Sequence, residues 1–142
     1  MLRTFLKPLA YICIIFMITA CSNEMGHEKQ DIVVKKQVGD ENKYETFNKI
    51  TDTKRVEEVR KILNDAHWKN AQVDFIRPAD YQFIYEFKNP DFDAKAVLHR
   101  VWISPKKDEL QIIRGDFDYT QLPKAESARL FEILTGERLG ED

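Results

Sequence analysis

The tripeptide Asp-Phe-Asp occurs twice, so that Asp91 and Asp93 form one pair of carboxylates and Asp116 and Asp118 form another. Residues two apart on a strand share a face, and carboxylate oxygens are ligands that calcium accepts. The alternative is that these acids keep two turns soluble while each phenylalanine closes the edge of a core. Because the sequence lacks a twelve-residue calcium loop ending in glutamate, we expect no bound metal.

Residue types suited to catalysis are present without the context that catalysis needs. His99 lies on the apolar face of a predicted strand, and neither Ser104 nor Ser127 stands in a Gly-x-Ser-x-Gly motif. The sequence also lacks a glycine-rich phosphate loop. We therefore expect no catalytic residue, no cofactor and no enzymatic activity. A small cell-envelope hydrolase or a metal-dependent enzyme stays open as the alternative function.

The N-terminus carries the one residue to which the sequence assigns definite chemistry, Cys21. Arg3 and Lys7 precede an apolar run of twelve residues at positions 9–20, which is too short to span a bilayer and matches the core of a secretory signal. The run ends in Ile18-Thr-Ala-Cys21, which resembles a bacterial lipobox. That resemblance implies a diacylglycerol on the Cys21 thiol and cleavage just before it, whereas the alternative is a signal anchor with an incidental cysteine.

The chain divides into a signal peptide (1–20), the lipidated cysteine with a polar tether (21–31) and one small domain (32–142). Its 142 residues suit one domain. Lysine and arginine number 22 against 24 acids, a formal net charge of −2, so no nucleic-acid partner is expected. Membrane attachment through Cys21 places the monomeric domain on the outer face of the cell membrane.

Two amphipathic segments predict helices that pack on a common core. In residues 53–66 the apolar side chains recur at helical spacing, and Thr51 or Asp52 supplies an N-cap oxygen. Pro123 opens the second helix, which extends to Leu134, and Gly136 suits the position after its end.

Alternating apolar residues predict strands at 81–87 and 97–103, a third at 109–114 and a short fourth near Phe117 and Tyr119. The segments 32–38 and 44–50 are weaker candidates, and Lys35 and Lys36 indicate that the first lies at a sheet edge. The short connections favour an antiparallel meander. The predicted fold class is therefore α+β: an antiparallel sheet of about four strands with two helices packed on one face, after the signal and tether.

The face of this sheet that points away from the helices is the predicted partner surface. Alternation places Trp102, Arg100, Ile84 and Ile113 on that face. Tryptophan and arginine are enriched at binding hot spots. An envelope protein is therefore expected to dock there, unless the N-terminal segment 32–38 covers the face.

The lipobox, the 53–66 helix, the hairpin of 97–103 with 109–114, and the stretch Tyr119-Thr-Gln-Leu-Pro-Lys124 before the last helix together resemble the YhfM-like small lipoproteins of Gram-positive bacilli. The resemblance covers about residues 50–135. It implies a small extracytoplasmic α+β domain and carries over no catalytic residue. The expected function is that of a membrane-tethered binding or accessory module of the cell envelope.

Overall fold

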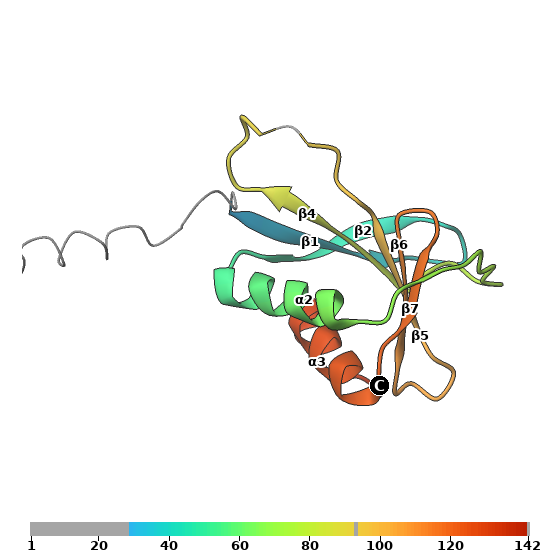
Figure 1. Ribbon diagram of the computed structural model, residues 1–142. Coiled ribbons are helices and arrows are strands. Elements are labelled where there is room, and N and C mark those ends of the chain that lie inside the picture. The colour runs from blue at the N-terminus through green and yellow to red at the C-terminus, as the bar shows by residue number, and fades with distance from the viewer. Residues whose placement is uncertain (1–28, 93, 142) are drawn as a thin grey trace, which may run out of the picture.

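A computed structural model describes residues 29–92 and 94–141 (Figure 1). It shows a seven-stranded antiparallel sheet in the order β2-β1-β4-β5-β6-β7-β3, with two helices on one face. The strands are β1 (Gln30–Gln37), β2 (Tyr44–Ile50), β3 (Lys69–Asn70), β4 (Tyr81–Phe87), β5 (His99–Ile103), β6 (Leu110–Arg114) and β7 (Asp118–Gln121); the helices are α2 (Thr53–Asp65) and α3 (Lys124–Thr135). The α+β class and the antiparallel pairing are thus confirmed.

The sheet has more strands than expected, and the N-terminal strand lies inside it. β1 is hydrogen-bonded to β2 on one side and to β4 on the other, so the prediction of an edge strand is wrong. The side chains of Lys35 and Lys36 are exposed. Side chains on a strand project from the faces of the sheet, so their exposure does not show whether the strand backbone is hydrogen-bonded on both sides. The Lys36 ammonium lies over the rings of Phe47 and Tyr81.

Local capping interactions account for the start of α2 and the end of α3. The Asp52 side chain accepts a hydrogen bond from the Lys54 backbone N–H at 2.8 Å, which satisfies one of the free donors at the start of α2. At the end of α3, Gly136 has a φ of 75°, where a side chain would be strained, and its N–H bonds to the Glu132 carbonyl.

The main core lies between the helices and one face of the sheet. It contains apolar side chains that alternate along the strands and recur at helical spacing, among them Ile32, Val34, Val56, Val59, Leu63, Phe83, Val101, Leu110, Ile112, Leu130 and Leu134. Ser127 is fully buried there; its hydroxyl accepts from the Leu110 N–H and donates to the Leu122 carbonyl. This pair of bonds joins α3 to β6 without leaving a buried polar group unpaired.

Two connections decide what lies on the other face of the sheet. Residues 71–80 link β3 to β4, and residues 88–98 link β4 to β5. The strand predicted at 97–103 begins only at His99, so Val97 and Leu98 belong to the second connection and are exposed. The prediction that this strand starts at residue 97 is therefore wrong by two residues.

Candidate functional site

The segment 71–80 crosses the helix-free face of the sheet and packs on Trp102. The Phe75 ring lies nearly parallel to the Trp102 ring, with the planes 9° apart and the centroids separated by 3.8 Å. The Trp102 indole N–H donates to the Arg77 carbonyl at 3.0 Å. Both the apolar ring and the polar N–H of Trp102 therefore have partners within the domain.

Trp102 is therefore not an open docking residue, and its predicted exposure is wrong. Only 4% of Trp102 is accessible, and the same holds for Ile113. With Ala79 they form a second small core, against which Tyr44, Val73, Phe75 and Tyr119 pack. Alternation placed both residues on the correct face of the sheet, but it carries no information about which distant segment covers that face. The cover is segment 71–80 and not the N-terminal strand.

The other two predicted face residues are half-buried and lie apart from each other. Arg100 pairs with Ile113 across β5 and β6, its guanidinium carbon lies 5.9 Å from the Trp102 ring centroid, and it donates to the Gly115 carbonyl. Ile84 pairs with Val33 on β1 instead. The structure thus brings Arg100, Trp102 and Ile113 together and leaves Ile84 outside the group.

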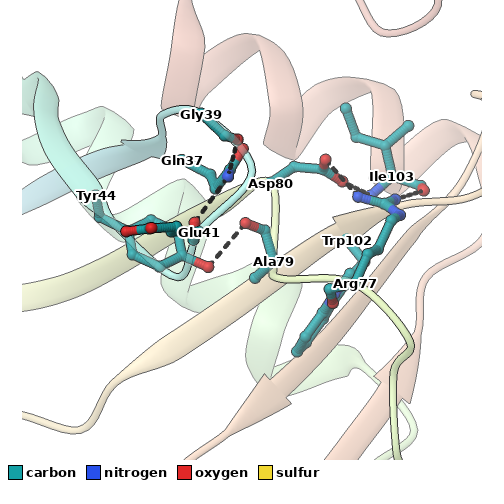
Figure 2. Close-up of polar contacts among 9 residues, drawn as sticks. All are labelled: Gln37, Gly39, Glu41, Tyr44, Arg77, Ala79, Asp80, Trp102 and Ile103. Carbon is teal, nitrogen blue, oxygen red and sulfur yellow. Dashed lines mark hydrogen bonds and ion pairs between the residues drawn. The ribbon is translucent and has the colours of Figure 1, made fainter.

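Asp80 holds the end of segment 71–80 against β5 (Figure 2). One carboxylate oxygen accepts from the Ile103 N–H at 2.7 Å, and the other lies 2.5 Å from the Arg77 guanidinium. Arg77 also donates to the Ile103 carbonyl at 2.8 Å. The Asp80 backbone bonds to both Val101 and Gln37, so one residue connects the segment to β5 and β1.

The turn between β1 and β2 supports the same segment from the other side (Figure 2). The Tyr44 hydroxyl donates to the Ala79 carbonyl at 2.9 Å, and burial raises the pKa of Tyr44. The Gln37 side-chain amide donates to the Gly39 and Glu41 carbonyls within the turn. Segment 71–80 is consequently held through Ala79, Asp80 and the contact of Arg77 with Trp102.

Two hollows border segment 71–80, and the second extends past the sheet to Phe131 of α3. The first has a volume of about 940 Å³ and lies between the segment and β4, β5 and residues 95–98; its polar lining includes Asn42, Tyr44, Asp74, Gln82, Lys95 and Arg100. The second, of about 750 Å³, is bounded by the β5–β6 turn and the residues after α3. Ile76 stands between them with its whole side chain exposed, at 106% relative accessibility. Segment 71–80 lies across the sheet as a strap, and we call the first hollow, together with Ile76, the strap groove.

We expect Asp80 to be the residue whose substitution most weakens the attachment of segment 71–80 to β5. Asp80→Ala removes a charged acceptor and leaves the Ile103 N–H without its partner, so we expect unfolding free energy to fall by about 2 kcal/mol. Exposed Asp74, on the same segment, is the matched control, and Asp74→Ala should change stability by less than about 0.5 kcal/mol. Equal stability of the two variants in urea melts would contradict the assignment of Asp80 as the anchor.

Asp91 lies in the β4–β5 connection, Asp116 lies in the β6–β7 turn and lines the strap groove, and Asp118 begins β7. Asp118 pairs with Arg114 at 3.2 Å, and Asp91 and Asp116 are exposed. Asp93 lies outside the described residues. Within residues 29–92 and 94–141, no three His, Cys, Asp or Glu side chains are grouped as metal ligands.

His99 is buried beside Phe83, and its ring is uncharged near neutral pH. Its ring stacks on Phe83, with centroids 4.5 Å apart, and its Nδ1–H donates to the Val97 carbonyl at 3.1 Å. Burial lowers the pKa of His99 to about 4. A general base would need a pKa nearer to the working pH, so this histidine serves the fold.

The comparison with protein-family models identifies the chain. The model described as "YhfM protein" matches residues 26–140. The chain belongs to the YhfM family. No curated protein and no solved structure matches it.

The YhfM match covers the whole described domain, from before β1 to after α3, and therefore includes Asp80 and the strap groove. Cys21 lies outside both the match and the described residues, so its lipidation stays a prediction. No helix in the described part of this YhfM protein has the length and apolarity to cross a membrane.

Reasoning from the sequence missed the residues that organise the site. Phe75, Arg77 and Asp80 were assigned no role because segment 71–80 was not interpreted as packing on the sheet. The available signal was the alternation in residues 71–75, where Ala71, Val73 and Phe75 are half-buried and Gln72 and Asp74 are exposed. Such an alternation indicates that one side of a segment packs on another part of the protein, although it does not name the partner surface.

Proposed function

We propose that this YhfM family protein is a lipid-anchored extracytoplasmic module that binds an envelope protein through the strap groove. The observation that carries the proposal is the wholly exposed Ile76 on a segment fixed by Asp80, Ala79 and Trp102. An apolar side chain on a pre-ordered support binds a partner without the entropic cost of ordering a loop. Arg100, half-buried in the adjoining hollow, supplies the polar contact that a hot spot needs.

The role of Trp102 in this proposal differs from the one expected from the sequence. Trp102 supports the binding surface from below, whereas Ile76 and Arg100 meet the partner. Truncating either of them should weaken association while the fold stays intact, because Ile76 is exposed and Arg100 is not part of the main core.

Photocrosslinking in the cell envelope tests the groove. A photoreactive amino acid at Ile76 is expected to give a discrete crosslinked product that Arg100→Ala diminishes. The same amino acid at exposed Glu126, on the helix face of the domain, is the matched control. Equal products at positions 76 and 126, or a product at 76 that is indifferent to Arg100→Ala, would contradict the proposal.

The lipid anchor is tested separately at Cys21. The Cys21→Ala variant is expected to accumulate as an uncleaved precursor without lipid, because only a thiol accepts the diacylglycerol in a lipobox of the form Ile18-Thr-Ala-Cys21. Cys13→Ala removes the other cysteine and should leave processing unchanged. Mass spectrometry of the mature N-terminus is the measurement. Cleavage at another position, or an unmodified Cys21, would refute the anchor.

A further inference from the structure

Among the residues that the structure describes, six large apolar side chains are exposed, and four of them lie at one end of the sheet. We call these four the loop-end patch. Phe92, Val97 and Leu98 belong to the β4–β5 connection and Phe117 to the β6–β7 turn, with accessibilities between 38% and 56%. The alternative expected from the sequence, in which Phe92 and Phe117 close the edge of the core, is therefore wrong for both rings.

The two connections that carry the loop-end patch are joined to each other. The Gly115 N–H donates to the Leu98 carbonyl at 2.9 Å, and a side chain at Gly115 would lie against the Val97 methyl group. Phe92 rests on Phe87, with ring centroids 5.7 Å apart. Phe92, Val97 and Leu98 thus each lie at a point where the β4–β5 connection contacts the rest of the domain.

The chain enters the domain at this same end. β1 begins where β4 ends, because Gln30 pairs with Phe87, and the Lys88 N–H donates to the Lys29 carbonyl. In Figure 1 the start of β1, the end of β4 and the β4–β5 connection lie together. Whatever precedes residue 29 therefore leaves the domain beside the loop-end patch.

Chain length limits how far this end can be from a lipid anchor. Gln30 lies nine positions after Cys21, and a fully extended chain covers at most about 3.5 Å per residue, so the reach is about 30 Å. A site tethered over such a distance has an effective concentration in the millimolar range, at which even a weak apolar contact is populated.

We propose that the loop-end patch rests on the surface of the lipid bilayer and orients the domain, with the β5–β6 turn at the other end of the sheet directed away from the membrane. Val97 and Leu98 also line one end of the strap groove, which therefore opens beside the membrane surface. This inference rests on the lipid anchor of the proposed function. Asp91 and Asp116 each stand next to a phenylalanine of the patch, and their carboxylates favour the headgroup layer over the acyl chains. The contact is therefore shallow and apolar, and anionic lipid does not strengthen it.

Depth-dependent quenching in the lipidated full chain, reconstituted in phosphatidylcholine vesicles, tests the orientation. An environment-sensitive fluorophore is attached to Val97→Cys, and in a second sample to Lys106→Cys in the β5–β6 turn, at the other end of the sheet. Quenchers carried on the lipids are expected to reduce emission at position 97 and to leave position 106 unaffected. Flotation with the vesicles reports the anchor independently.

Matched substitutions show whether the apolar rings cause the contact. Phe92→Ser with Phe117→Ser should abolish quenching at position 97 while flotation persists. Ile76→Ser removes a more exposed apolar side chain outside the patch and should leave the quenching unchanged.

Each other outcome overturns the inference in a distinguishable way. Equal quenching at 97 and 106, or none at either, in protein that floats would refute the orientation and leave the anchor standing. Failure to float would refute the anchor, and the inference with it. A spectral shift at 97 that appears without vesicles and grows with protein concentration would assign the loop-end patch to a second copy of the chain.

Discussion

Replacing Trp102 with alanine is expected to lower the free energy of unfolding by about 3–5 kcal/mol, the usual range for a buried aromatic residue. The side chain is 4% accessible, it stacks on Phe75, and its indole N–H satisfies the Arg77 carbonyl. Alanine would leave a cavity, an unpaired carbonyl and an exposed Phe75. Chemical denaturation of the variant measures the loss.

Ile76→Ala is the matched control, since it truncates a large apolar side chain of the same segment that is wholly exposed. It should change stability by less than about 0.5 kcal/mol. Fluorescence quenching by an aqueous quencher adds a second readout, and Trp68→Phe isolates the Trp102 signal. A readily quenched Trp102 whose alanine variant unfolds like the parent would show that segment 71–80 does not cover it.

Acidification is expected to destabilise the domain through His99 by about 3 kcal/mol in total, from the difference between the ordinary histidine pKa of about 6.5 and the folded-state pKa of about 4. Burial lowers the pKa in the folded protein, so the unfolded chain binds the proton first. Stability is therefore unaffected above about pH 6.5, falls as the pH decreases from there to about 4, and loses nothing further through this group below that value.

His99→Leu removes the titrating ring and should flatten the stability profile between pH 6.5 and 4. His67→Gln removes an exposed histidine beyond the end of α2 and serves as the control. Urea melts at several pH values compare the three proteins. A profile for His99→Leu as steep as that of the parent would mean that other groups dominate the acid response.

Much of the fold follows from patterns that are local in the chain. Val56, Val59 and Leu63 recur on one side of α2, and Tyr81 and Phe83 alternate with polar neighbours on β4, so periodicity alone identified both elements and their buried faces. The pattern failed where pairing partners were needed. β3 has only two residues, Lys69 and Asn70, and exists because β7 pairs with it.

The candidate site was predicted less completely than the fold. Alternation correctly separated Trp102 from Val101, because adjacent residues on a strand must point to opposite faces. It could not reveal that Phe75 covers Trp102, since the two residues are far apart in the chain and a local pattern does not name the surface on which a segment packs. Nor could it show that Asp80 binds the Ile103 N–H.

The sequence by itself determined the α+β class, the two helices and the central strands. These depend on the order of side chains within a few residues, which sets helical or strand periodicity. The lipid anchor inferred from Ile18-Thr-Ala-Cys21 stays a prediction. Only the tertiary structure decided that β1 is an inner strand, that Trp102 is core, and that Ile76 and the loop-end patch remain exposed. Exposure depends on which remote segment packs over a residue, and that is settled by the packing of the whole chain.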